Sequence, residues 1–136
     1  MRIQTLPPGE IDGAIALWHE AGLTRPWNDP GEDLRRALQG PASTVLVGFE
    51  VDRLVATAMV GHDGHRGWVY YVAVAATARR AGHGRAMMAA CEEWLAERGI
   101  VKLNLMVRGD NAVARGFYEA LDYAPDDVIV LSHRLR

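Results

Sequence analysis

The sequence predicts an α/β fold in a single domain, and three observations lead to this prediction. The chain has 136 residues, which is the length of one ordinary domain. Segments with the apolar alternation of β-strands are interspersed with segments of helical periodicity. One strand-like segment runs through a basic, glycine-containing loop directly into a helix-like segment, from Trp68 to Glu97. The predicted order is β-α-α-β-β-β-α-β-α-β, without an internal repeat or a linker.

Composition and charge exclude several classes of function. Hydrophobic residues make up 49% of the chain and charged residues 24%, which is typical of a soluble globular protein. The net charge of −2 gives no overall basic field that would indicate nucleic-acid binding. A single cysteine, Cys91, leaves no intramolecular disulfide, and no apolar segment approaches the roughly 20 residues of a membrane helix. The N-terminal segment lacks the apolar region of a signal peptide. We therefore expect a cytoplasmic protein that binds neither membranes nor nucleic acid.

The first third of the chain predicts a short strand followed by two helices. Residues 2–6 indicate the strand only weakly. Residues 10–21 place their apolar side chains on one helical face, and Gly22 is a natural end for this helix. Residues 32–39 predict the second helix, because its two leucines lie four positions apart. The expected start of this helix has a capping side chain from Asn28 or Asp29, followed by Pro30.

The middle of the chain predicts three strands and the longest helix. Residues 44–51 and 54–60 are strand-like and joined by a short connection, which indicates a hairpin. Residues 69–74 are rich in β-branched and aromatic side chains and predict the next strand. Residues 84–98 predict a helix with a buried apolar face. Because Cys91 lies on that face, we interpret it as a core residue and not as a nucleophile.

The last third predicts a strand, a helix and a closing strand. Residues 101–107 alternate between two faces, as a strand does. Residues 111–121 carry apolar side chains at helical spacing. Residues 128–135 alternate weakly and are expected to form the final strand. A homodimer built through that strand is one expected assembly.

The loop at residues 79–85 has the features of an anion-binding site. Its three arginines bring positive charge to the start of a helix, where free N–H groups and the helix dipole favour a phosphate. Gly82 and Gly84 let the backbone approach a ligand closely. The loop has no Gly-Lys-Ser/Thr of a P-loop and lacks the third glycine of a dinucleotide loop. A phosphorylated small molecule is the expected ligand, and a solvated strand-to-helix connection is the alternative.

Three features of the chain resemble the GNAT N-acetyltransferases. Arg79-Arg80-Ala81-Gly82-His83-Gly84 matches the (Gln/Arg)-x-x-Gly-x-(Gly/Ala) loop with which that family binds the acetyl-CoA pyrophosphate. Asn111-x-x-Ala114-x-x-x-Tyr118 and the order of elements are also similar. Residues 23–30 and 64–67 look like those of the small bacterial YpeA-type acetyltransferases. The resemblance implies one GNAT acyl-CoA N-acyltransferase domain over residues 1–136, with a central mixed, mostly antiparallel sheet and about four helices.

The resemblance also implies how the chain would bind its acetyl donor. The backbone of residues 72–74 would contact the pantetheine arm and the thioester carbonyl, where a donor must meet the developing oxyanion. Acetyl-CoA is the implied co-substrate, and no cluster of residues has the spacing of a metal site. The implied cofactor-binding residues are Val72, Ala73, Val74, Arg79, Arg80, Ala81, Gly82, His83, Gly84, Arg85, Asn111 and Tyr118.

The resemblance assigns the general acid more clearly than the general base. Tyr118 would protonate the departing thiolate, because a phenol with a pKa near 10 stays protonated at neutral pH. A packed aromatic is the alternative for Tyr118, and a plain helix cap is the alternative for Asn111. Asp63 and His65 are candidates for the base that deprotonates the amine. Other candidates are His62, Glu50, Asp29 and a chain of water molecules.

Two positions depart from the family pattern. Asp122-Tyr123 stands where the family usually has Gly-Phe or Gly-Tyr, and Asp tolerates a left-handed backbone better than most residues. Met106 stands where the ribosomal-protein N-terminal acetyltransferases carry a glutamate, and a methionine cannot act as a base. This departure argues against the activity of that branch here.

The expected function is direct transfer of acetyl from acetyl-CoA to a primary amine of a small molecule or a peptide, in a ternary complex. Residues 23–30 and 61–67 would frame the acceptor, and nearby acidic side chains favour a cationic amine. A non-catalytic acyl-CoA-binding or sensing module on the same fold is the alternative, because fold alone does not fix function.

Overall fold

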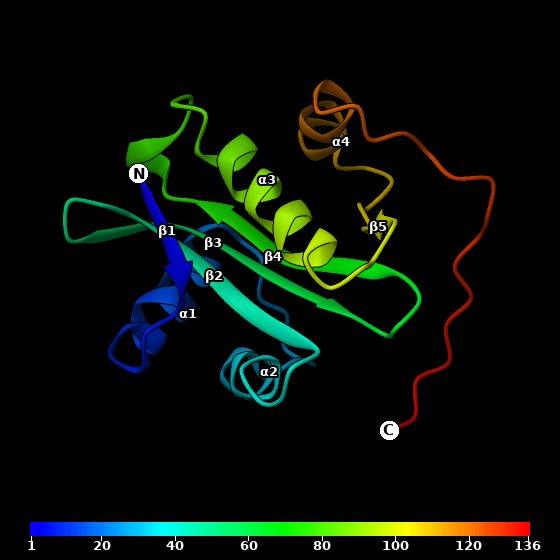
Figure 1. The fold of residues 1–136 in the computed structure, drawn as a ribbon, viewed down its shortest axis with the longest axis horizontal. Helices are drawn as coiled ribbons and strands as arrows, with labels where there is room; N and C mark the ends of the chain where they lie inside the picture. The colour runs from blue at the N-terminus through cyan, green and yellow to red at the C-terminus, as the bar shows by residue number, and fades with distance from the viewer. The chain divides into compact units, whose positions relative to one another are not determined.

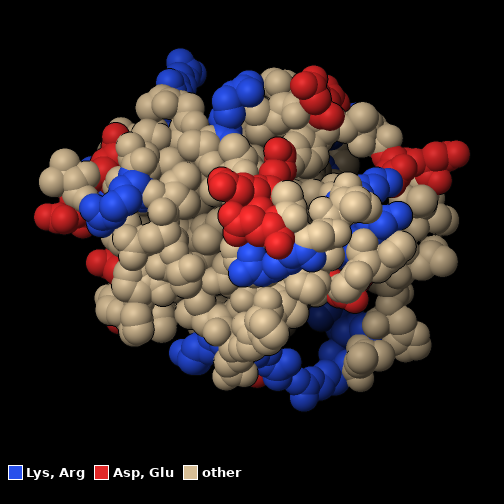
Figure 2. All heavy atoms as spheres, in the orientation of Figure 1, with Lys and Arg blue, Asp and Glu red and all other residues tan.

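The computed structural model describes all residues from 1 to 136, which divide into two units, Met1–Leu105 and Met106–Arg136. The first unit holds the sheet and three α-helices, and the second holds one helix and the C-terminal segment (Figure 1). Charged side chains of both signs are mixed over the face shown in Figure 2. No helix combines the length and apolarity that crossing a membrane would require. The elements are β1 (Arg2–Thr5), η1 (Pro8–Glu10), α1 (Ile11–Glu20), α2 (Pro30–Ala37), β2 (Ser43–Glu50), β3 (Arg53–His62), β4 (Gly67–Val74), η2 (Ala76–Ala78), α3 (His83–Ala96), β5 (Leu103–Asn104) and α4 (Ala112–Ala120).

The sheet has five strands in the order β1-β2-β3-β4-β5. The first four strands pair antiparallel, and β5 pairs parallel to β4. This confirms the predicted mixed, mostly antiparallel sheet. The hairpin of β2 and β3 is also confirmed, although its turn places Val51 at a φ of 55°, which is unusual for a β-branched residue.

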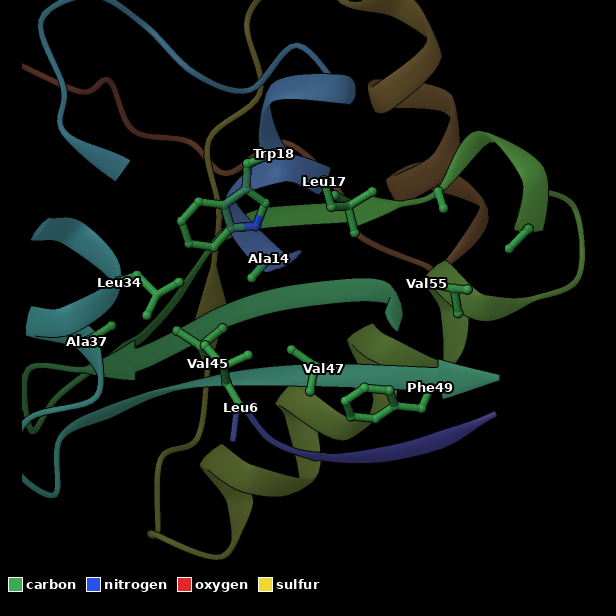
Figure 3. Close-up of a cluster of buried hydrophobic side chains, with 13 residues drawn as sticks. Leu6, Ala14, Leu17, Trp18, Leu34, Ala37, Val45, Val47, Phe49 and Val55 are labelled. Atoms are coloured by element: carbon green, nitrogen blue, oxygen red, sulfur yellow. The ribbon is translucent and has the colours of Figure 1, made fainter. Parts of the chain in front are cut away.

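Strand β2 is buried on both faces, and the two faces meet different helices. Val45, Val47 and Phe49 belong to a core cluster with Trp18 of α1 and Leu34 of α2 (Figure 3). The opposite face of the sheet packs against α3, which contacts β2, β3 and β4 (Figure 1). Successive side chains of a strand point to opposite faces, so an apolar run without polar alternation is what a sheet covered on both sides requires.

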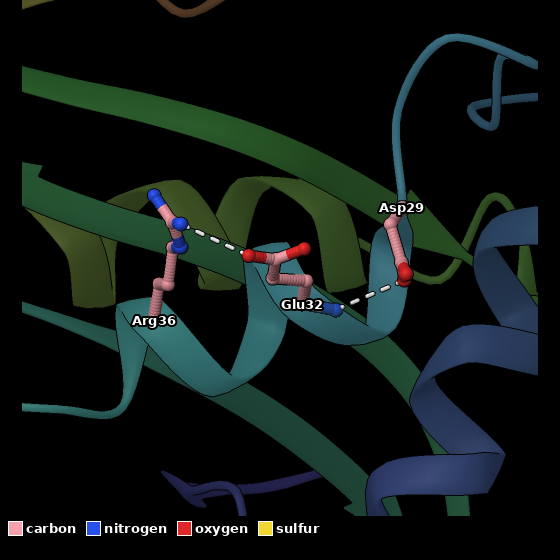
Figure 4. Close-up of polar contacts among 3 residues, drawn as sticks. All are labelled: Asp29, Glu32 and Arg36. Carbon is pink, nitrogen blue, oxygen red and sulfur yellow. Dashed lines mark hydrogen bonds and ion pairs between the residues drawn. The ribbon is translucent and has the colours of Figure 1, made fainter.

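The start of α2 follows the sequence expectation closely. The side chain of Asp29 accepts a hydrogen bond of 3.0 Å from the backbone N–H of Glu32, and Pro30 opens the helix (Figure 4). The cap is therefore Asp29 and not Asn28. Glu32 and Arg36 form an exposed ion pair of 2.9 Å, a type of pair that contributes little to stability.

Two strand predictions near the C-terminus need correction. The strand predicted over residues 101–107 is reduced to the two residues of β5. Residues 128–135 form no strand, and Val128, Ile129, Val130 and Leu131 are exposed. An alternating pattern yields a strand only where another strand accepts its hydrogen bonds, and the second unit contains no strand. The observed order is therefore β-α-α-β-β-β-α-β-α.

Candidate functional site

The loop between β4 and α3 is built around two left-handed residues. After η2, Arg80 has a φ of 66° and Gly82 a φ of 80°, and α3 begins at His83. A Cβ on Gly82 would meet no atom within 4 Å, so the backbone angle and not lack of space favours glycine here. Through these two left-handed residues the chain passes from η2, which follows β4, into the first turn of α3.

The N-terminus of α3 has no side-chain cap. Its N-cap residue is Gly82, which has no side chain to accept a hydrogen bond from the first turn. The first turn contains no acidic residue. Helix starts of this kind present backbone N–H groups and the positive end of the dipole to an anionic ligand.

Three arginines surround this helix start. Arg79, Arg80 and Arg85 are exposed, and none of them forms an ion pair with a carboxylate. The Nε of Arg79 donates a hydrogen bond of 3.3 Å to the carbonyl oxygen of Val74, the last residue of β4. In the view of Figure 2, Lys and Arg side chains project at the edge where this loop lies. The charge of the three guanidinium groups is thus available to an anion.

His83, the variable position of the loop pattern, is held inside the protein. Its side chain is 10% exposed, and its Nε2 lies 3.3 Å from Oε2 of Glu50 at the end of β2. The alignment does not make this contact a hydrogen bond, and the two side chains form an ion pair only when the imidazole is protonated. The contact links the start of α3 to the β2–β3 hairpin. No sequence pattern indicates this contact, because the partners are far apart in the chain.

Strand β4 carries a bulge just before the predicted thioester-binding segment. Thr57 pairs with Ala73 and Met59 pairs with Tyr70, so Tyr71 and Val72 both lie opposite Ala58. Tyr71 has a φ of 53°, a left-handed angle that is rare for an aromatic residue.

Tyr71 is fixed by side chains from three other elements. Its ring stacks on Trp18 of α1, with centroids 3.9 Å apart and planes 13° from parallel. Its hydroxyl donates a hydrogen bond of 2.8 Å to Oδ2 of Asp33 on α2. Thr57 of β3 donates from Oγ1 to the carbonyl oxygen of Tyr71 at 2.9 Å. Burial, followed by the nearby carboxylate of Asp33, raises the pKa of the Tyr71 hydroxyl, which therefore remains a donor.

The two base candidates Asp63 and His65 lie in the turn between β3 and β4. Oδ1 of Asp63 accepts backbone N–H groups from Arg66 at 2.8 Å and His65 at 2.9 Å, and these bonds lower the pKa of its carboxyl. A lowered pKa makes a weaker base. Nδ1 of His62 similarly accepts the N–H of Gly64 at 3.0 Å. The turn and the arginine loop lie at opposite ends of β4, so the structure does not bring them together.

The second unit contains Asn111 and Tyr118. Oδ1 of Asn111 accepts the N–H of Ala114 at 3.0 Å and so caps α4. Tyr118 is half-buried and packs edge-on against Phe117 and Tyr123, with centroids 4.9 and 5.9 Å away. Asn111 is therefore a helix cap and Tyr118 a packed aromatic residue, as the two alternative interpretations predicted.

The end of α4 explains how the chain tolerates Asp122. This residue has a φ of 69°, and its N–H donates to the carbonyl of Glu119 while that of Tyr123 donates to Tyr118. The pair of bonds is a Schellman motif with aspartate in the position usually held by glycine. The expected left-handed aspartate is confirmed.

Cys91 lies in the interior, as its position on the helix predicts. It is fully buried on α3, and burial raises the pKa of its thiol to about 12. Residues 1–136 contain no group of three or more histidine, cysteine, aspartate or glutamate side chains that could hold a metal ion.

Comparison with known proteins gives a consistent picture. A family model described as the acetyltransferase (GNAT) family matches residues 14–123. An acetyltransferase of Yersinia enterocolitica is 40% identical over 135 residues, which cover 99% of this chain and 96% of that protein. An acetyltransferase of Sodalis glossinidius is 39% identical over 136 residues, with 99% and 96% covered.

Solved structures share the fold at much lower identity. The structure of AAC(6')-Iy with the bisubstrate analogue CoA-S-monomethyl-acetylneamine has a TM-score of 0.83 at 13% identity, covering 98% of this chain and 97% of that one. An aminoglycoside acetyltransferase from an uncultured soil metagenomic sample, in complex with sisomicin, has a TM-score of 0.80 at 17% identity, covering 99% and 96%.

Proposed function

The chain belongs to the GNAT family of acetyltransferases, and from this premise we propose that it transfers acetyl from acetyl-CoA directly to a primary amine. One observation carries the proposal most strongly. A bulged strand, β4, leads into a loop whose unpaired arginines surround the uncapped N-terminus of α3. Since the family match runs across both units, we also propose that residues 1–136 act as one domain.

The donor half would bind acetyl-CoA through backbone and charge. N–H groups of the first turn of α3 would receive the pyrophosphate, and the three guanidinium groups of the loop would neutralise its charge. The β4 backbone of residues 72–74 would guide the pantetheine arm toward the bulge. Asn111 of the second unit would add a polar contact to that arm.

The chemistry needs a positioned amine, a donor for the oxyanion and an acid for the leaving group. The amine nitrogen attacks the thioester carbon, the C–N bond forms, and the C–S bond breaks as the oxyanion collapses. The backbone of residues 72–74 would stabilise that oxyanion. Tyr118 would give its proton to the thiolate, and the proton lost by the amine would pass to solvent. Holding both reactants together in one complex supplies much of the rate.

The amine must lose a proton before or during attack on the thioester. Asp63 and His65 remain candidates for the base, but the turn bonds of Asp63 favour a structural role for its carboxylate. A water chain that removes the proton from the amine fits these contacts better. The same observation supports the second candidate function, a non-catalytic acyl-CoA-binding module.

The acceptor is proposed to be a cationic amine. Asp29 and Glu32 add negative charge where α2 begins, beside the segment of residues 23–30, although Asp29 also caps the helix and Glu32 also pairs with Arg36. Fold relatives that are bound to sisomicin or to a CoA–acetylneamine analogue support a small amine such as an aminoglycoside over a protein terminus.

A screen of amines and peptides with release of CoA as readout tests the function. We expect turnover of at least one cationic amine by the wild type. Tyr118→Phe is expected to lower kcat by about 100-fold, the lower range for loss of a general acid, while CoA binding by calorimetry persists. Tyr123→Phe is the matched control, because it removes a hydroxyl from the neighbouring half-buried ring.

Two outcomes would contradict this proposal in different ways. CoA binding without acetylation of any amine would favour the binding module. Absence of CoA binding would overturn the assignment of the arginine loop itself.

A further inference from the structure

We propose that Thr57 and Asp33 are positioning residues for acetyl transfer, because they hold Tyr71 in the left-handed conformation that begins the bulge of β4. This inference rests on the proposed function. The inference adds that side chains on the α1 and α2 side of the sheet determine the direction of the Val72 N–H.

The backbone at Tyr71 is strained and needs support. A left-handed angle is unfavourable for an ordinary L-residue, and such residues persist where the surrounding structure holds them. The φ of 53° at Tyr71 occurs inside a strand and not in a loop. It coincides with the point where two residues of β4 face one residue of β3. The strain and the bulge are therefore one feature.

Thr57 fixes the peptide plane between Tyr71 and Val72. Its side chain is fully buried, accepts the indole N–H of Trp18 at 2.8 Å and donates to the carbonyl of Tyr71 at 2.9 Å. In a trans peptide, the carbonyl and the following N–H lie in one plane and point in opposite directions. Because the carbonyl points at Thr57, the N–H of Val72 must point away from Thr57. The hydroxyl of Thr57 thus aims a backbone donor of the segment proposed to meet the oxyanion.

Asp33 and Trp18 hold the ring of the same residue. The ring lies flat on Trp18, which is itself fully buried, and its hydroxyl ends on Asp33 of α2. The side chain therefore cannot swing out unless it loses both contacts. Residues of β3, α1 and α2 thus hold the carbonyl, the ring and the hydroxyl of Tyr71, respectively.

Substitution of Thr57 separates positioning from stability. Thr57→Val keeps the shape but removes the hydroxyl, leaving the Trp18 N–H and the Tyr71 carbonyl without a partner. We expect kcat for acetyl transfer to fall by about tenfold or more, while the Kd for CoA stays within about threefold. Thr57→Ser should restore kcat because it keeps the hydroxyl. Thr44→Val is the matched control, because Thr44 is the other buried threonine and lies on β2.

All rates are measured well below the melting temperature of every variant. A Thr57→Val protein with a lower Tm but an unchanged kcat would overturn the inference, since only a structural role would remain. A wild type that acetylates no amine would instead overturn the proposed function. If Thr57→Val does not fold, Asp33→Leu on the half-buried surface of α2 decides in its place. Loss of its bond to Tyr71 should lower kcat by about threefold to tenfold with CoA affinity retained, and an unchanged kcat would contradict the proposal.

Discussion

The two faces of the sheet are held by different interactions. The face toward α3 is closed by apolar side chains of that helix, Met87, Met88, Cys91 and Leu95. The face toward α1 and α2 has an apolar core as well, but inside it Trp18, Thr57 and Tyr71 form a chain of hydrogen bonds that ends at Asp33. Buried polar groups of this kind must be satisfied, and when satisfied they define one arrangement.

We infer from this difference that the two faces stabilise different features of the structure. Apolar packing fixes α3 on the sheet and so fixes the helix start that would receive the pyrophosphate. Directional hydrogen bonds on the other face fix a backbone angle in β4, which apolar packing cannot specify as well. Changes on the α3 face should therefore act on stability, and changes in the hydrogen-bond chain should act on turnover.

The largest effect is expected for the reactivity of the Cys91 thiol, which tests whether solvent is excluded from the interface between α3 and the sheet. Its pKa is raised from 9.0 to about 12, with burial as the main cause. An acid with a raised pKa stays protonated to higher pH, so at pH 8 the folded protein should hold about 1000-fold less thiolate than an unfolded chain. Alkylation at pH 8 should accordingly be very slow until denaturant is added. Fast labelling of the native protein would show that α3 opens readily.

The next effect tests how closely α3 fits the sheet. A Cβ on Gly67 of β4 would overlap the side chain of Leu95. We expect Gly67→Ala to cost about 1–3 kcal/mol by overpacking and Leu95→Ala to cost about 2–5 kcal/mol by leaving a cavity. The double variant should lose less than the sum, because the new methyl group occupies space that Leu95 has vacated. Urea unfolding of the four proteins measures the coupling, and strict additivity would argue against the tight contact.

The smallest effect compares two residues with left-handed backbones. Val51 has a φ of 55° like Tyr71, but its side chain is 87% exposed in a hairpin turn. Asparagine tolerates this angle better, so Val51→Asn should raise stability by about 0.5–1 kcal/mol. Val101→Asn serves as the control, since Val101 is 85% exposed and has no positive φ. Equal effects in the two variants would show that the angle at residue 51 carries no strain.

The features that the sequence predicted are mostly local. The strand, loop and helix around residues 68–97 follow from periodicity and glycine placement, and their contacts are close in the chain. The end of α4 is local too, so Asp122 could be recognised as a left-handed residue in advance.

The features that were missed or wrong depend on distant partners. Tyr71 and Asp33 are 38 residues apart, and Trp18 and Thr57 are 39 residues apart. Neither pair can be recognised in the sequence, because an aromatic residue that makes a specific buried hydrogen bond has the same spacing as any other aromatic residue of the core. The closing strand at residues 128–135 failed for the same reason, since alternation says nothing about whether a partner strand is present.

A crystal structure with bound acetyl-CoA would test the central claim most directly. We predict that the pyrophosphate lies within hydrogen-bond distance of the N–H groups at the start of α3, with guanidinium groups of the arginine loop around it. The thioester carbonyl should face the N–H of Val72 at the bulge of β4. A pyrophosphate bound elsewhere on the protein, or a thioester turned away from β4, would contradict the account.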